Sequence, residues 1–272
     1  MSGRGGVRGY HTRGFHRDPL QGVVRRAFAF DPIPYAGGGF ASEAAPTDFM
    51  HNSVRPVTGA GRWDRAGVAP SADWDRRWGG RPQPRGDLLY ATEEAFVSPN
   101  CDGTTGKFSV ASLAGSYGGE GWRSTPSDPF RLQTVGSWSP YEQEGTSPTA
   151  FCSAHYFELR DGIIAYAFYA QGTRFLDVSD PSNPIQIAYW RPDDTNVWAP
   201  YYYGDYIYTA DHGRGVDVLR LTDDARAAAD DRTDLAAPPM SAAAVANAEE
   251  AVRRFAPDPD LGWTCVLPRA AT

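Results

Sequence analysis

Lysine, cysteine and long apolar runs are all scarce in this sequence, and each absence excludes something. Lys107 is the single lysine, so arginine carries nearly all of the positive charge, which we interpret as the mark of a GC-rich genome. Lys and Arg number 26 against 33 Asp and Glu, a net charge of −7. That balance argues against nucleic-acid binding and against charge-driven docking on an anionic membrane. No run of about 18 apolar residues exists, so no membrane span is expected.

The three cysteines, Cys101, Cys152 and Cys265, allow at most one intrachain disulfide and form no CxxC motif. A Cys101–Cys152 disulfide and two free thiols are both compatible with this count, and Cys265 is an alternative partner for either. The Arg- and Gly-rich N-terminus lacks an apolar core, so this chain shows no secretory signal peptide as it stands.

Turn-forming and aromatic residues, by contrast, are abundant. The chain of 272 residues contains 29 Gly and 22 Pro, and 13% of it is aromatic. Hydrophobic residues make up 41%, enough for a packed core. This composition favours many short strands over long helices.

A repeat of 43 residues runs through residues 150–222 without a gap. Residues 161–167 (DGIIAYA) align with 204–210 (GDYIYTA), and residues 172–180 align with 215–223. A strand-rich unit of this length is typical of a four-stranded propeller blade.

The best-preserved unit predicts four strands, at 155–159, 163–169, 173–178 and 185–190. Asp161-Gly162 suits a tight hairpin turn, and the SDPSNP segment makes a rigid corner before the fourth strand. An earlier, interrupted copy predicts strands at 51–55, 87–91, 106–110 and 135–140, with residues 59–86 as a long surface insertion.

The chain divides on this basis into an irregular tail and lead-in (1–47), blades (48–222), a linker (223–240) and a C-terminal helix with a tail (241–272). The blades are an interrupted unit (48–145), a complete unit (150–194) and a unit without a fourth strand (195–222). Ser241 is expected to cap the helix and Pro257 to stop it, with an apolar stripe of Val245, Ala248, Val252 and Phe255.

The string FLDVSDPSNPIQIAYW, at 175–190, resembles the LVIVD repeat. The resemblance is good over 153–222, weak over 50–142 and absent before 48 and after 224. It implies an all-β propeller or partial propeller, similar to the C-terminal part of an exported, extracellular or cell-envelope protein. Three units are fewer than the four to eight blades of a closed propeller. Either residues 1–47 supply degenerate strands, or N-terminal blades are missing because this is the C-terminal part of a longer propeller, or copies associate; we favour the second.

His51 and His155 both fall on predicted inner strands, which line the central channel of a propeller, and Cys152 lies three residues before His155. Imidazole and thiolate together suit copper or zinc. The alternative is that both histidines bond backbone groups near the channel. Candidate ligand-binding residues are Trp198 and Tyr201, in an aromatic run suited to sugar stacking, and Arg214.

No complete catalytic motif accompanies this architecture, so the sequence favours a non-catalytic scaffold that presents loops to a protein or glycan partner. The alternative is a metal-dependent (copper or zinc) oxidoreductase with a His/Cys site at the channel. The two differ in one geometric requirement. The enzyme needs His51 and His155 to converge on one ion, whereas a scaffold does not.

Overall fold

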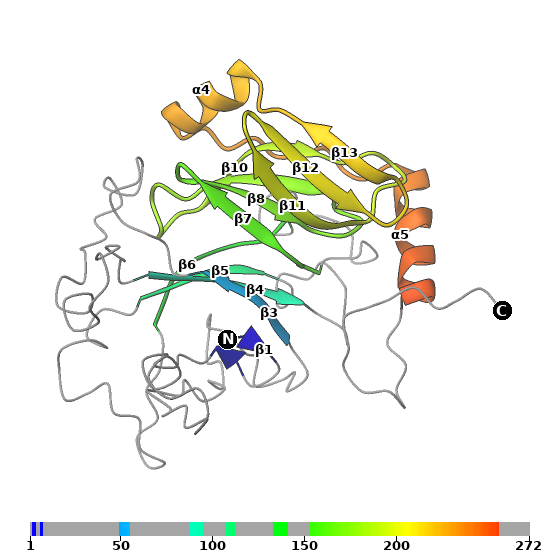
Figure 1. Ribbon diagram of the computed structural model, residues 1–272, viewed down its shortest axis with the longest axis horizontal. Coiled ribbons are helices and arrows are strands. Elements are labelled where there is room, and N and C mark those ends of the chain that lie inside the picture. The colour runs from blue at the N-terminus through cyan, green and yellow to red at the C-terminus, as the bar shows by residue number, and fades with distance from the viewer. Residues whose placement is uncertain are drawn as a thin grey trace, which may run out of the picture.

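The fold is mostly β. The computed structural model describes residues 2–3, 6–7, 49–54, 88–94, 107–112, 133–140 and 153–255. These residues form three antiparallel sheets of three or four strands, a short two-stranded hairpin and two helices, α4 and α5. The three sheets lie one above another, with the second in the middle (Figure 1). This confirms the expected four-stranded antiparallel units and the C-terminal helix, while closure into a propeller stays a prediction.

Each sheet corresponds to one unit of the sequence repeat and follows chain order from one edge to the other. The first contains β3 (Phe49–Val54), β4 (Leu88–Glu94), β5 (Phe108–Ser112) and β6 (Gln133–Trp138). The second contains β7 (Phe157–Arg160), β8 (Ile163–Ala167), β9 (Thr173–Asp177) and β10 (Ile185–Trp190). The third has only β11 (Val197–Tyr203), β12 (Tyr206–Asp211) and β13 (Gly215–Leu219).

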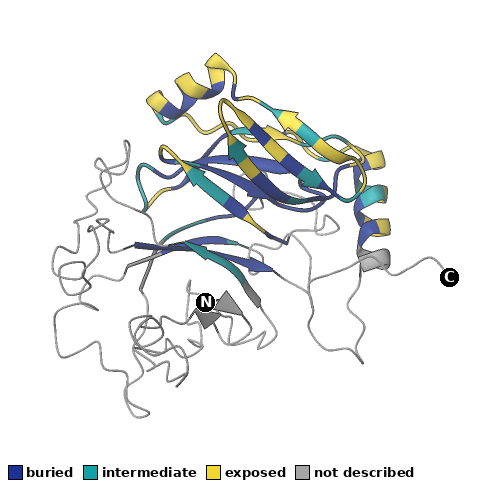
Figure 2. Cartoon of the chain, in the orientation of Figure 1, coloured by how far each residue is buried: buried dark blue, intermediate teal, exposed yellow. Residues whose placement is uncertain are grey.

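The middle sheet is buried on both faces because successive side chains of a strand point to opposite sides. Ile164 and Leu176 join a core with Phe108 and Trp138 of the first sheet. Phe175, one residue along β9, joins a second core with Ile207 of the third sheet. Buried strands accordingly run through the centre of the stack (Figure 2).

The prediction of a linker at 223–240 needs correction, because the first half of this segment forms helix α4 (Asp223–Asp231). Thr222 caps this helix by accepting a hydrogen bond from the Ala225 backbone N at 3.2 Å. Its buried face consists of alanines, including Ala228 and Ala229, which pack into the core between the second and third sheets. Five of the nine residues of α4 are charged, so the composition alone did not indicate its narrow buried face of alanines.

Helix α5 (Ala242–Phe255) matches the expected position, and the Ser241 side chain caps it by accepting from Ala244 N at 3.0 Å. Its buried residues, however, are Ala244, Ala248 and Ala251. Val245 is only half-buried. The side chains of Val252 and Phe255 lie outside the part of the chain that the structure describes. Ala248 is therefore buried as predicted, whereas the prediction for Val252 and Phe255 is untested.

Some expectations fall on parts of the chain that the structure does not describe. The insertion 59–86 and the tail after residue 255 are of this kind, as are Cys101, Cys152 and Cys265. Within the predicted lead-in 1–47, β1 (Ser2–Gly3) and β2 (Gly6–Val7) pair with each other and lie beside β3. In the described part of the chain, neither helix has the length and hydropathy to cross a membrane.

Candidate metal centre

Each unit carries an extra residue at the same place, in its first strand or in the segment that leads into that strand. The pairing of β3 with β4 shifts register around His51, and the pairing of β11 with β12 shifts around Trp198. In the second sheet, Ala167 pairs with two residues, accepting from His155 N and donating to the Tyr156 carbonyl. Such bulges redirect side chains. The repeat thus places His51, His155 and Trp198 at equivalent bulged positions.

The ends of the second strands supply a second set of equivalent residues. Glu94 ends β4, Tyr169 lies two residues after β8, and His212 lies one residue after β12. Tyr169 and His212 are 43 residues apart, one repeat. Neighbouring units are joined here, because the backbones of Tyr169 and Val197 exchange two hydrogen bonds of 3.0–3.1 Å.

His51, Glu94 and His155 converge. One ligand atom from each lies within 4.8 Å of the others. His51 Nε2 is 3.7 Å from Glu94 Oε2, and His155 Nε2 is 3.9 Å from Glu94 Oε1. The three side chains are only 1–3% exposed. The cluster spans two sheets, since His51 and Glu94 belong to the first and His155 leads into the second.

Hydrogen bonds fix the orientation of two of these groups. His155 Nδ1 lies 2.8 Å from the Trp198 carbonyl oxygen. A carbonyl can only accept, so the neutral ring donates through Nδ1 and keeps its lone pair on Nε2, facing Glu94. The Tyr169 hydroxyl donates to Glu94 Oε1. A metal-ligating histidine is commonly held in this way by a backbone carbonyl.

Burial sets the protonation of the cluster. It lowers the pKa of His51 to about 4. It also lowers the pKa of His155 to about 2, and the neighbouring His51 adds to that shift. Burial raises the pKa of Glu94 to about 8, although the hydrogen bond from Tyr169 opposes the rise. Both imidazoles are therefore neutral at pH 7, which is the form that binds a metal.

Two polar atoms of this cluster lack a hydrogen bond from the described residues, namely His155 Nε2 and Glu94 Oε2. Buried polar atoms without partners are uncommon in folded proteins, and an ion is one standard explanation. Four ligands placed about 2.1 Å from a tetrahedral zinc lie about 3.4 Å apart. The separations of 3.7 and 3.9 Å, which involve the two different oxygens of Glu94, exceed this value by a few tenths of an ångström. The three ligand atoms as a set lie within 4.8 Å of one another, so they would have to draw together to hold an ion.

Tyr156 covers the cluster on its solvent side. Its ring meets His51 and His155 edge-on, with centroid separations of 4.5 and 4.7 Å, and the residue is 41% exposed. On the other side, the Trp198 ring lies 5.0 Å from the His155 ring and 4.5 Å from the His212 ring. Aromatic rings therefore contact both imidazoles of the cluster.

Of the residues predicted for a metal, His51 and His155 are brought together, and Cys152 lies outside the described residues. Glu94 was missed. Its sequence signal is weak, because it is the second acid of a Glu93-Glu94 pair at the end of an apolar strand. Only the register between β3 and β4 places its carboxyl beside His51.

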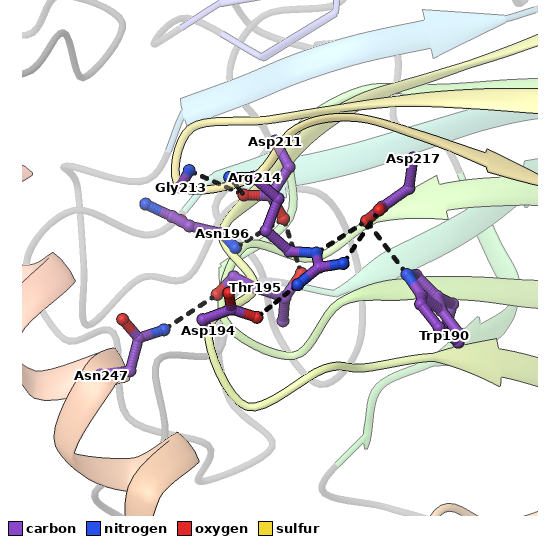
Figure 3. Close-up of polar contacts among 9 residues, drawn as sticks. All are labelled: Trp190, Asp194, Thr195, Asn196, Asp211, Gly213, Arg214, Asp217 and Asn247. Carbon is purple, nitrogen blue, oxygen red and sulfur yellow. Dashed lines mark hydrogen bonds and ion pairs between the residues drawn. The ribbon is translucent and has the colours of Figure 1, made fainter.

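The residues predicted to bind a ligand lie in three different surroundings. Trp198 packs between His155 and His212. Tyr201 lies on the exposed face of β11. Arg214 lies in the β12–β13 turn, where its guanidinium pairs with Asp194 at 2.7 Å and Asp217 at 3.1 Å (Figure 3).

The carboxylates around Arg214 leave no need for an external anion. Asp217 Oδ2 also accepts a hydrogen bond from Trp190 Nε1 at 3.0 Å (Figure 3). Hydrogen bonding from Arg214 holds the pKa of the Asp217 carboxyl below its usual value. Asp211 accepts from the backbone N of Gly213 and Arg214 at 2.8 and 3.0 Å. This polar group ties the turn to the preceding loop.

Comparison with known proteins adds no family. No protein-family model matches the chain, and neither does any curated protein. One similar solved structure is that of the computationally designed Ika4 protein, at 9% identity and a TM-score of 0.31. The alignment covers 50% of this chain and 61% of the designed protein, and the likeness is too weak to define a fold class.

Proposed function

We propose that the protein binds a divalent transition-metal ion through His51, Glu94 and His155. The observation that carries the proposal is the convergence of three ligand atoms within 4.8 Å in a buried cluster drawn from two sheets. Sequence separation makes this convergence informative, because 43 residues divide His51 from Glu94 and a further 61 divide Glu94 from His155.

Zinc and copper are the ions that this ligand set fits best. Two imidazoles and a carboxylate make a borderline set of nitrogen and oxygen donors. Zinc sites with three protein ligands and an open fourth position are of the catalytic type. A thiolate from Cys152 as fourth ligand would favour copper or a closed zinc site instead.

A metal-dependent oxidoreductase is the enzymatic function that follows from such a centre. Bound there, the ion would supply redox or Lewis-acid chemistry. The residues of the chain have separate roles. Trp198 and Tyr169 orient His155 and Glu94 through hydrogen bonds, and Tyr156 limits the access of water. These positioning contacts keep the ligands in place before an ion arrives.

We also propose that the three sheets are consecutive propeller blades. The equivalent bulges at His51, His155 and Trp198 support this, as does the stacking of the sheets in chain order. The inner strands of blades then meet at the metal centre. The scaffold function with a protein or glycan partner, and the exported location implied by the LVIVD resemblance, remain predictions.

Elemental analysis of the full chain after loading with zinc or copper and dialysis tests the metal centre. We expect a single ion per chain in the wild type and a loss of bound metal in His155→Gln and Glu94→Gln. His212→Gln is the matched control, because His212 is a nearby histidine outside the cluster. It should retain the ion.

Circular dichroism of every variant separates a lost ligand from a lost fold. A folded wild type without stoichiometric metal would refute the proposal. So would folded His155→Gln and Glu94→Gln variants that bind metal as the wild type does.

A further inference from the structure

The outer face of the third sheet is covered with apolar side chains. Because strand residues alternate between faces, Ile207 and Thr209 of β12 are buried while their neighbours point outward. The register places the outward residues of the three strands side by side. They are 36–77% exposed: Tyr201, Tyr203, Tyr206, Tyr208, Val216 and Val218. We call this set the tyrosine face. It lies on the side of β11–β13 away from the middle sheet, because Ile207, on the opposite face of β12, packs in one core with Phe175 of β9. Figure 2 shows exposed stretches along these strands.

The six residues of the tyrosine face are uncharged, and the exposed Arg220 borders them just after the end of β13. The charges of this sheet lie at its turns and toward its other side, where Arg214 and Asp217 pair with each other. An exposed apolar patch of this extent marks an interaction surface in soluble proteins. Tyrosine in particular is enriched at protein interfaces.

The repeat itself indicates what kind of surface covers such a face. Ala165 and Phe175 occupy the positions 43 residues before Tyr208 and Val218. Both are almost fully buried, packed in one core with Ile207 of the third sheet. In the middle unit this face is therefore covered by another sheet. In the third unit, no described part of the chain covers it.

We propose that two copies of this chain pair face to face through the tyrosine face. A twofold pairing brings each patch against itself, which a charged patch would resist and this uncharged one does not. Four tyrosines and two valines with this exposure offer about 600 Å² per copy, or about 1,200 Å² in total. That area equals the lower limit for specific interfaces. Among the described strands, no other sheet face exposes a comparable set of apolar side chains.

Sedimentation equilibrium of the full chain over a range of concentrations tests the pairing. The wild type should have the mass of two chains and dissociate on dilution. Tyr203→Arg and Val218→Arg put like charges opposite each other, and each should weaken association at least about 100-fold. Leu235→Arg is the matched control, since Leu235 is exposed but follows α4 and bonds to the backbone of β10. It should stay dimeric.

A wild type that stays monomeric at every concentration would overturn the proposal. Face variants that associate as tightly as the wild type would do the same. If a monomeric wild type binds an insoluble polysaccharide and Tyr203→Arg does not, the face is a glycan platform instead. Metal content should be the same in Tyr203→Arg and the wild type, so this proposal and the metal centre can fail separately.

Discussion

At the scale of single residues, the three groups of the metal centre are costly to the fold. A buried polar group left without a full set of hydrogen bonds costs roughly 1–3 kcal/mol. His155 Nε2 and Glu94 Oε2 are both in this position. A bound cation would offset the cost, because it would take up both lone pairs. This residue-level balance makes the protein's stability sensitive to pH when no metal is bound.

We expect the metal-free protein to lose stability as pH rises from about 6.5 to about 8. The folded-state pKa of Glu94, about 8, lies above its ordinary value of 4.5, so the folded form holds a proton that the unfolded chain releases. The stabilising contribution of that proton is complete below pH 4.5 and is lost as pH rises through 8. Between pH 6.5 and pH 8 the loss amounts to about 2 kcal/mol, which can be measured by urea unfolding.

Glu94→Gln is the control for this effect, since the amide keeps the shape and has no proton to lose. Its unfolding free energy should stay flat between pH 6.5 and 8. Below pH 6.5 both proteins should lose stability, because the lowered pKa values of His51 and His155 leave the unfolded chain binding more protons. Parallel curves for the two proteins above pH 6.5 would contradict the assignment.

At the scale of elements, the SDPSNP corner is a junction between three parts of the fold. Asp180 Oδ1 accepts from the backbone N of Ser182 at 3.0 Å, and this holds the corner's shape. Arg232, which ends α4 in a left-handed conformation, donates to Ser179 Oγ at 2.9 Å and so ties the helix to the corner. The backbone of Pro181 in turn lies against Gly136 of β6.

Gly136→Ala should therefore destabilise the protein by about 2–3 kcal/mol. A Cβ at this position would lie 2.2 Å from the Pro181 carbonyl oxygen. Since backbone cannot rotate away as a side chain can, β6 and the corner would have to separate. Chemical denaturation of the variant measures the cost.

Gly204→Ala provides the comparison. Gly204 has a φ of +57° and nothing within 4 Å of its would-be Cβ, so only backbone strain is expected, about 1 kcal/mol. A Gly136→Ala variant no less stable than Gly204→Ala would show that the close contact between β6 and the corner is absent in solution.

At the scale of the whole molecule, the metal centre joins the first and second sheets at one end of their shared core. His51 and Glu94 come from one sheet and His155 from the lead-in to the next. An ion that binds only the folded form stabilises it by about 2.7 kcal/mol at 100 times its Kd. We therefore expect the ion to raise the temperature at which the two sheets unfold together.

Zinc in such excess should raise the melting temperature by about 5–10 °C relative to the protein in a chelator, by differential scanning calorimetry. His155→Gln should show no such difference. A wild type that melts at the same temperature with zinc and with chelator would indicate that no ion bridges the sheets.

Much of this architecture was predictable from the sequence. The 43-residue repeat located the strands of the second and third sheets, because alternation and turn residues act over a few positions. The third unit lacks a fourth strand in the sequence repeat, and its sheet has three strands among the residues that the structure describes. His51 and His155 were candidate ligands because the repeat gave both a place on inner strands, but whether they meet was left open, with backbone hydrogen bonds as the alternative.

Other features required the fold. Glu94 joins the centre through the register between β3 and β4, and α4 is helical because the neighbouring sheets bury its alanines. The sequence by itself determined the strand-rich repeat, the rigid corner and the two histidines, all products of local pattern. Tertiary structure alone decided which carboxyl completes the site and which sheet face remains exposed. Strand register and the packing of one sheet on another depend on residues far apart in the chain.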